Sequence, residues 1–289
     1  MKPAPYGYSD PRSIDETLAL LARHGDDAKI LAGDQSLVPL LNFRLARPAL
    51  IVDVYRVDGL DALTPQDGTL RVGALVRQRR LERWARERAP LLAAALALVG
   101  HAAIRNRGTV AGSVVHADPA AELPALLLAL DGVALARSSR GERQIAAAEL
   151  FRGPLVTSVA SDELVVETRF TLPASAEGWG LHEVARRHGD FALAGAVAVL
   201  GLRDDRIERP RISVFGVAPT ALRLNAAERA LTGQSPDAAI FREVAESACR
   251  ELDAPSDIHA TAAYRRRVSA TLVARALADA TGRAQAASR

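Results

Sequence analysis

Two short stretches of small and polar residues carry the strongest chemical signal in the sequence. The first, residues 33–36 (Gly-Asp-Gln-Ser), follows an apolar run and leads into a second apolar segment that contains Pro39. This order predicts a strand, a tight turn and the start of a helix, because a helix tolerates proline in its first turn. A turn of this kind directs several backbone N–H groups at one point, so it can hold a phosphate without a lysine.

The second stretch, residues 105–113 (RNRGTVAGS), has the same character. Gly108 and Gly112 flank Thr109, and the hydroxyl groups of Thr109 and Ser113 add donors to those of the backbone. One such turn is most often structural. Two of them in one N-terminal half, each leading into a helix, indicate a pyrophosphate held between two loops, as a dinucleotide cofactor requires.

Several other kinds of site have no signature in the sequence. No G-x-G-x-x-G follows a predicted strand, and neither a Walker A lysine motif nor a G-x-S-x-G elbow is present. The six histidines do not pair at metal-ligand spacing, and the single cysteine, Cys249, excludes an intrachain disulfide and a four-thiolate cluster. His116 lies near Asp118, as an acid–base pair would, but a loop histidine that orients a neighbour is commoner. We predict no catalytic residue and no metal ligand here, and a buried structural role for Cys249.

The composition is that of a globular protein, with 49% hydrophobic residues, 25% charged residues and a net charge of +3. All basic residues except Lys2 and Lys29 are arginines, and they form no stripe interleaved with aromatic residues, which argues against nucleic-acid binding. No signal-peptide pattern opens the sequence, and the longest apolar run, residues 90–99, is too short to cross a membrane. We expect a soluble cytoplasmic protein without a transmembrane segment.

The spacing of apolar residues predicts the elements that must position the two turns. In the N-terminal part we expect helices at residues 13–24, 77–88, 90–99 and 118–130, and strands at residues 49–55, 70–74, 133–136 and 163–170. Residues 100–116 show little periodicity. The last of these helices would begin with Asp118 as its cap and Pro119 as its first residue.

A cluster of Pro, Ala, Ser and Gly at residues 173–180 predicts a domain boundary. Beyond it we expect strands at residues 181–187, 192–202 and 211–217, then helices at residues 226–232, 237–252 and 261–280, with residues 281–289 frayed. Strands followed by helices indicate a small α+β domain.

Four segments in order resemble the FAD-binding medium subunit of the molybdenum hydroxylases, the family that contains carbon monoxide dehydrogenase and the flavin domain of xanthine dehydrogenase. They are residues 31–48 (LAGDQSLVPLLNFRLARP), 105–125 (RNRGTVAGSVVHADPAAELPA), 185–199 (ARRHGDFALAGAVAV) and 257–268 (DIHATAAYRRRV). The resemblance covers essentially the whole chain, and four ordered segments are far more specific than either loop alone.

The resemblance implies an α+β fold in two domains. Residues 1–175 would form a two-lobed FAD-binding domain of the PCMH/vanillyl-alcohol-oxidase type, with lobes at about residues 1–58 and 59–175. Residues 180–285 would form a small C-terminal domain like that of the carbon monoxide dehydrogenase flavoprotein, with a three-stranded sheet and helices.

The resemblance also implies which residues bind FAD. The first loop would wrap the pyrophosphate with Ala32, Gly33, Asp34, Gln35, Ser36 and Leu37. The second loop would do so from the other side with Thr109, Val110, Ala111, Gly112 and Ser113. The resemblance also places Asp118 at the sugar portion of the flavin and Leu164 near the isoalloxazine. Looser matches are His182, in place of a family lysine near the flavin, and Val99 and Ile104 along the cofactor cleft.

Two positions depart from the family pattern. Asp34 stands where the family usually has a second glycine, and Ala111 replaces the first glycine of a pair. The carboxylate of Asp34 could repel a pyrophosphate, or it could point away and brace the turn by an Asx-type bond. The methyl group of Ala111 could obstruct a backbone that must approach closely or adopt a positive φ. Neither change removes the N–H donors.

The implied function is electron transfer. The chain would pass electrons from two [2Fe–2S] clusters of a small partner subunit through FAD to a terminal acceptor, while a molybdopterin-binding large subunit oxidises the substrate. The assembly would be a dimer of such heterotrimers. Two alternatives stay open: a stand-alone flavin-dependent oxidase or dehydrogenase, and a scaffold that has lost FAD through Asp34 and Ala111. The sequence names neither the substrate nor the acceptor.

Overall fold

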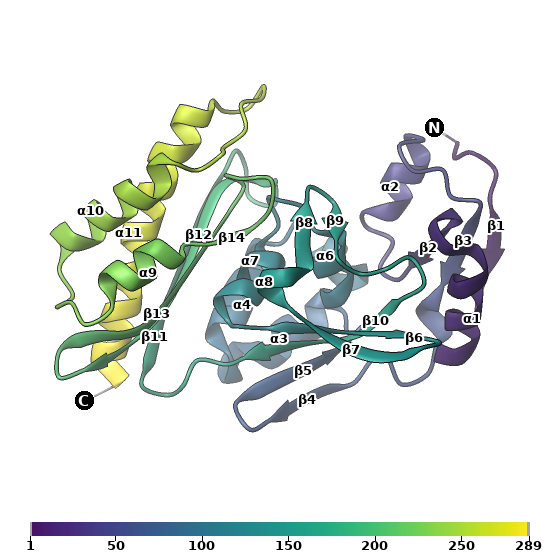
Figure 1. The fold of residues 1–289 in the computed structure, drawn as a ribbon, viewed down its shortest axis with the longest axis horizontal. Helices are drawn as coiled ribbons and strands as arrows, with labels where there is room; N and C mark the ends of the chain where they lie inside the picture. Colours follow the sequence, from purple (N-terminus) through teal and green to yellow (C-terminus); the bar gives the residue numbers. More distant parts are fainter. Residues whose placement is uncertain (1, 288–289) are drawn as a thin grey trace.

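The structure is a computed structural model that describes residues 2–287 (Figure 1). Along its length it comprises a small N-terminal lobe, a central lobe with an antiparallel sheet, and a C-terminal sheet covered by helices. The helices are α1 (Ile14–His24), α2 (Leu37–Asn42), α3 (Gln78–Arg88), α4 (Pro90–Leu98), α5 (Ala102–Arg107), α6 (Val110–His116), α7 (Glu122–Ala129), α8 (Ala147–Leu150), α9 (Asn225–Leu231), α10 (Ala238–Arg250) and α11 (Ala262–Ala287). The strands are β1 (Gly7–Ser9), β2 (Ala28–Leu31), β3 (Leu50–Asp53), β4 (Leu63–Gln66), β5 (Thr69–Gly73), β6 (Val133–Ser138), β7 (Gly141–Ala146), β8 (Phe151–Gly153), β9 (Val156–Thr157), β10 (Leu164–Thr171), β11 (Glu177–Ala185), β12 (Ala192–Arg203), β13 (Arg206–Phe215) and β14 (Leu222–Arg223).

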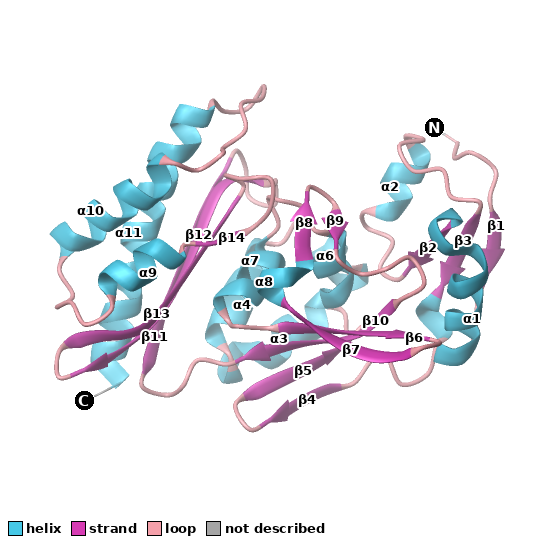
Figure 2. Ribbon diagram, in the orientation of Figure 1, coloured by secondary structure: helices cyan, strands magenta, loops and turns pink. Residues whose placement is uncertain are grey.

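The N-terminal lobe contains the first of the two predicted turns. Its sheet has the order β1-β3-β2, with both outer strands parallel to β3 (Figure 2). Helix α1 begins after Ser13, whose hydroxyl oxygen accepts a hydrogen bond from the N–H of Glu16, and it ends at Gly25, which has a positive φ. The predicted strand, turn and helix are present as β2, residues 32–36 and α2, with Pro39 in the first turn of α2.

The central lobe is built on an antiparallel sheet of order β4-β5-β10-β6-β7. Its inner strands β5, β6 and β10 were predicted. The outer strands β4 and β7 were not, because they are mostly exposed and lack the apolar alternation of a half-buried strand. Residues 100–116, which show little periodicity, form the short helices α5 and α6.

The predicted helix start at Asp118 is wrong. Helix α7 begins only at Glu122. The carboxylate of Asp118 accepts a hydrogen bond from the N–H of Ala120 at 2.8 Å, which closes a turn, and Ala117 before it has a left-handed φ of 53°. Asp118 therefore caps a turn that precedes the helix, and Pro119 lies within that turn.

The C-terminal sheet has the order β11-β12-β13-β14 and is covered on both faces. Its three long strands are the predicted ones, and the two-residue strand β14 extends the edge. Val197 and Val199 of β12 join the core of the central lobe, whereas Ala194, Ala196 and Ala198 join the core beneath α10 and α11. Because both faces of β12 are buried, its sequence is a continuous apolar run.

Helix α11 lies directly on β11 because that strand carries Gly178 and Gly180. A Cβ atom on Gly178 would stand 1.8 Å from the carbonyl oxygen of Ala280 in α11, so the helix and the strand touch backbone to backbone. The helix continues to Ala287, with Ala284 fully buried. The predicted fraying is therefore wrong for residues 281–287, and residues 288–289 lie outside the described part of the chain.

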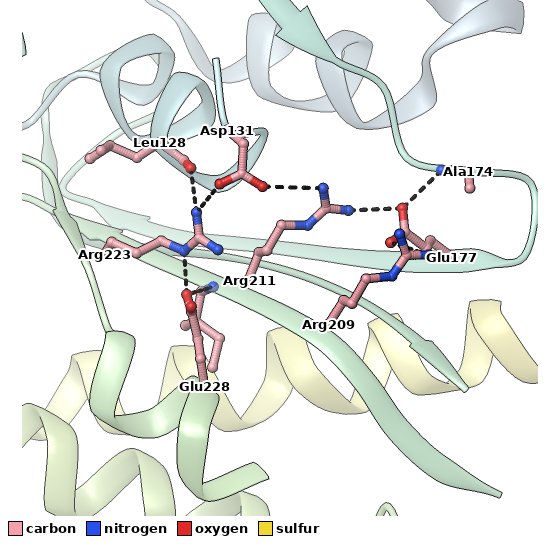
Figure 3. Close-up of polar contacts among 9 residues, drawn as sticks. Leu128, Asp131, Ala174, Glu177, Arg209, Arg211, Arg223 and Glu228 are labelled. Atoms are coloured by element: carbon pink, nitrogen blue, oxygen red, sulfur yellow. Dashed lines mark hydrogen bonds and ion pairs between the residues drawn. The ribbon is translucent and has the colours of Figure 1, made fainter. Parts of the chain in front are cut away.

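A cluster of ion pairs joins the central lobe to the C-terminal sheet (Figure 3). Asp131, in the turn after α7, accepts a hydrogen bond from Arg223 of β14 at 2.6 Å and lies 3.6 Å from Arg211 of β13. The buried Arg211 also donates to Glu177 of β11 at 2.8 Å, and Arg223 donates to the carbonyl oxygen of Leu128 at 2.9 Å. Displacing the two parts would leave buried charges unpaired, so this cluster fixes their relative position.

Two further expectations concern the chain as a whole. None of the helices in residues 2–287 is both long and apolar enough to cross a membrane.

Cys249 is buried in α10, as predicted, and burial raises the pKa of its thiol to about 12, so the thiol stays protonated and unreactive.

Candidate functional site

The two predicted loops touch each other at Gly33. A Cβ atom placed on Gly33 would lie 2.8 Å from the Cα of Gly108, 2.8 Å from the nitrogen of Thr109 and 2.9 Å from the carbonyl oxygen of Arg107. All three are backbone atoms, so this close approach requires glycine. The structure thereby joins two stretches that are far apart in the sequence into one site.

The first loop presents backbone donors that no group in the described chain occupies. Among residues 2–287, the N–H groups of Gly33, Asp34, Gln35 and Ser36 donate no hydrogen bond, although all four residues are partly buried. Backbone N–H groups that are withdrawn from water normally have a partner. The donor set, next to a contact that only glycine allows, fits an anion such as the pyrophosphate of FAD.

Asp34 connects the two loops. Its φ of 61° is left-handed, a conformation that glycine adopts most easily. Its carboxylate accepts hydrogen bonds from the Nε of Arg107 at 2.9 Å and from the side chain of Gln35. Burial opposes ionisation of Asp34, but these hydrogen bonds outweigh it, and the pKa of the carboxyl group is lowered. Within residues 2–287 its side chain accepts no hydrogen bond from a backbone N–H, so the Asx-type bond is absent. The ion pair with Arg107 joins the two loops instead.

Two arginines that were not selected from the sequence flank this contact. Arg107 is exposed, whereas Arg77 is partly buried and donates hydrogen bonds to the carbonyl oxygens of Ala32, at 3.2 Å, and of Arg107. The guanidinium of Arg77 also lies 5.4 Å from the ring centre of Tyr55. Burial, with repulsion from Arg107, lowers the pKa of Arg77, which still remains a cation. Because Asp34 neutralises one of these two positive charges, one net positive charge remains at the loops, and it favours an anion there.

The second loop uses most of its donors internally. The N–H of Val110 bonds to the carbonyl oxygen of Val76 at 3.0 Å, and the N–H of Gly112 bonds to the hydroxyl oxygen of Thr109 at 3.0 Å. The N–H of Ser113 bonds to the carbonyl oxygen of Thr109. Thr109 is therefore the buried N-cap of α6. The second loop therefore serves mainly to hold the first loop in position through the backbone contact at Gly33.

The remaining loop residues occupy ordinary backbone positions. Ala111 lies within α6 with a helical backbone, and its methyl group is buried in the core. It therefore does not obstruct the loop contact. Ala32 precedes Gly33 and its carbonyl oxygen is held by Arg77, while Leu37 is the first residue of α2.

Four further positions that the resemblance implies lie around the second loop. Val99 and Ile104 are close to Arg105, whose Nη1 donates to the carbonyl oxygen of Val99 at 2.9 Å, and Ile104 is 37% exposed. Leu164, the first residue of β10, is buried in the core that also holds α6. Asp118 lies in the turn after α6. Contact of these residues with a cofactor stays a prediction.

His182 is not brought together with the loops. Its Nε2 lies 3.1 Å from Oδ2 of Asp279 on α11, so the side chain points to the helix-covered face of β11. The next residue, Glu183, points the opposite way, because alternate residues of a strand face opposite sides. Glu183 acts electrostatically on Glu122, at the start of α7 in the central lobe.

Glu122 of the central lobe and Glu183 of the C-terminal sheet are two carboxyl groups whose pKa is raised by burial. Glu122 is 7% exposed, and burial, with repulsion from Glu183 and Asp118, raises its pKa to about 8. Burial also raises the pKa of Glu183 to about 7, and its Oε2 is buried without a hydrogen-bond partner in the described residues. Neither residue was selected from the sequence. The only local signal at Glu122 is an acid at a helix start, which is common in any protein.

The sequence matches two family models that together span nearly its whole length. Residues 4–175 match the FAD binding domain in molybdopterin dehydrogenase. Residues 179–280 match the CO dehydrogenase flavoprotein C-terminal domain.

Named relatives match over nearly their full length. The chain is 42% identical to the 6-hydroxypseudooxynicotine dehydrogenase complex subunit alpha of Paenarthrobacter nicotinovorans, covering 99% of this chain and 97% of that protein. It is 40% identical to the caffeine dehydrogenase subunit beta of Pseudomonas sp. strain CBB1, covering 98% and 97%. Among solved structures, a chain of carbon monoxide dehydrogenase from Hydrogenophaga pseudoflava superposes with a TM-score of 0.95 at 33% identity, covering 98% of this chain and 99% of that chain.

Proposed function

The chain belongs to the family of FAD-binding medium subunits of molybdenum hydroxylases, and we propose that it holds FAD between the two loops that meet at Gly33. The family and the α+β fold expected from the four sequence segments are confirmed. The observation that carries the proposed site is the contact of Gly33 with the second loop, beside the open N–H groups of residues 33–36.

The chain is a flavoprotein subunit of an oxidoreductase complex. We propose that its partners are a molybdopterin-binding large subunit and a small [2Fe–2S] subunit. We propose that it passes electrons from the clusters to a terminal acceptor, in a dimer of heterotrimers in the cytoplasm. FAD suits this role because it exchanges electrons singly and in pairs. We also propose that residues 1–175, with lobes at 1–58 and 59–175, form the FAD-binding domain, and that residues 180–285 form the C-terminal domain.

In this proposal the residues of the chain bind and orient the cofactor. The N–H groups of residues 33–36 donate to the pyrophosphate, and Arg77 and Arg107 offset its charge. The second loop, in which Thr109 caps helix α6, keeps the first loop in place. His182, whose Nε2 lies 3.1 Å from Asp279, is given no role at the pyrophosphate in this proposal, and its contact with the flavin stays a prediction.

Co-expression with a molybdopterin-binding large chain and a small [2Fe–2S] chain tests this function. The three chains should purify together with equimolar FAD, and removal of the FAD should leave the cluster spectrum intact while onward electron transfer stops. A chain that purifies alone and oxidises a substrate by itself would support the stand-alone oxidase. A complex that forms without any flavin would support the scaffold.

We expect Asp34→Asn to weaken FAD binding about 3-fold, because it removes the ion pair that braces the two loops while asparagine still tolerates the left-handed backbone. Equilibrium dialysis of the purified variant measures the change. Arg203→Gln, which removes an exposed ion pair with Glu208, is the control and should leave FAD binding unchanged. Tighter binding by Asp34→Asn would show that the carboxylate repels the pyrophosphate.

We expect the stability of the wild type to fall as the pH rises from about 4.5 to about 8, because folded Glu122 keeps its proton over this interval and the unfolded chain does not. Glu122→Gln removes the ionisable group and with it this loss of stability, so the variant should be more stable than the wild type by about 4 kcal/mol at pH 8 and by only about 1 kcal/mol at pH 5. Urea denaturation at both pH values measures the difference, with the exposed Glu149→Gln as control. A difference between variant and wild type that does not change with pH would contradict the expectation.

A further inference from the structure

An open groove between α10 and α11 lies outside the proposed FAD site. It has a volume of about 750 Å³ and is formed on the outer side of the C-terminal helices. Its floor consists of small or apolar side chains, from Ala270, Ala274 and Ala278 of α11 and from Ala238 and Phe241 of α10. Alanines along one face of a helix permit a third helix to pack at a short interaxial distance.

Arginines line both rims of the groove. They are Arg242 and Arg250 on α10 and Arg266, Arg267 and Arg275 on α11, and the one acidic residue among the lining side chains is Glu246. In the described part of the chain, the side chains of Arg242, Arg250 and Arg275 form no ion pair or hydrogen bond.

This differs from the ion-pair cluster in Figure 3, where Arg209, Arg211 and Arg223 each face a carboxylate of the same chain. Three of the five arginines on the groove are therefore available to an outside partner. Arg266 donates to the carbonyl oxygen of Leu252 at 3.1 Å, and Arg267 lies 5.9 Å from the ring centre of Tyr264. A row of cations on either side of an apolar floor is complementary to a helix with one apolar stripe flanked by acids on both sides.

We propose that this groove docks an acidic amphipathic helix of one of the two partner subunits, a proposal that rests on the proposed function. The helix places small or apolar residues on the alanine floor and pairs its Asp and Glu side chains with both arginine rims. A second copy of this chain is a poor occupant, because a two-fold contact sets the same arginine-rich surface against itself. Nucleic acid is also a poor occupant, because Phe241 is the sole aromatic residue lining the groove and is buried, which leaves no stacking surface.

Charge reversal tests the docking. The double variant Arg250→Glu/Arg275→Glu, with one change on each rim, should weaken association with the partner subunits at least about 30-fold and reduce its salt dependence. Arg229→Glu, on the exposed face of α9, is the matched control and should change association less than about 2-fold. Both variants should retain FAD like the wild type, because the groove is formed by α10 and α11 alone. Association is measured by titration calorimetry of the FAD-loaded chain.

A photo-cross-linking residue placed at Thr271, in the groove, identifies the occupant in the intact complex. Cross-links to an acidic helical segment of the large or small subunit support the proposal, and the same residue at Ala230 on α9 should give none. Cross-links to a second copy of this chain, to nucleic acid or to a segment without acids would overturn it, as would normal assembly of the double variant. If the wild type binds FAD but never associates with the two chains, the proposed partnership fails together with the groove; normal assembly of the double variant refutes the groove alone.

Discussion

Replacement of Gly33 by alanine will weaken FAD binding strongly while the rest of the fold remains intact. The new methyl group would lie within 2.9 Å of three backbone atoms of the second loop, which no side-chain rotation can relieve. The two loops must move apart, and the N–H groups of residues 33–36 lose their common direction. We expect the dissociation constant for FAD to rise about 100-fold, which corresponds to about 3 kcal/mol.

The control for this variant is Gly282→Ala. Gly282 lies in α11, and a Cβ atom there would meet nothing within 4 Å. FAD binding should not change, and the stability of the helix should rise slightly because alanine favours helices. Equilibrium dialysis gives the affinity and circular dichroism the fold. If Gly33→Ala keeps wild-type affinity for FAD, the loop contact has no part in binding.

Replacement of Gly180 by alanine will destabilise the C-terminal part of the chain. A Cβ atom on Gly180 would lie 2.0 Å from the carbonyl oxygen of Ala276, so α11 must lift from β11 and expose the alanine-rich core between them. The backbone φ of Gly180 is ordinary, so the effect is steric alone. We expect the free energy of unfolding to fall by about 3 kcal/mol or more.

Urea denaturation measures this loss, with Gly153→Ala as control. Gly153 lies on β8, and a Cβ atom there has nothing within 4 Å, so that variant should stay within about 0.5 kcal/mol of the wild type. A loss of less than about 1 kcal/mol for Gly180→Ala would mean that α11 can shift without cost, against the close packing described here.

The elements of the fold and the first loop could be predicted from the sequence because their signals are local. The cap at Ser13, the order of β2, turn and α2, and the apolar run of β12 each depend on neighbouring residues. The prediction of a helix start at Asp118 was wrong because the same residue types allow either a helix cap or a local turn. In the folded chain the carboxylate of Asp118 closes a turn with the N–H of Ala120.

It was harder to predict which side chains face the site, because the side of a sheet to which a strand residue points depends on the register of the strand. His182 and Glu183 are adjacent, yet they lie on opposite faces of β11, and a shift of one residue exchanges their roles. The pair of Asp34 with Arg107 joins residues 73 positions apart, so it exists only in the folded chain. Arg77 is likewise brought to the loops only by folding, where it donates hydrogen bonds to the carbonyl oxygens of Ala32 and Arg107.

Titration of the FAD-depleted wild-type chain with FAD and with FMN tests the central claim most directly. FMN carries a single phosphate, so it cannot bridge the donors of residues 33–36 as a pyrophosphate can. The account predicts equimolar binding of FAD and at least about 100-fold weaker binding of FMN. Equal affinity for the two flavins, or no binding of FAD, would contradict it.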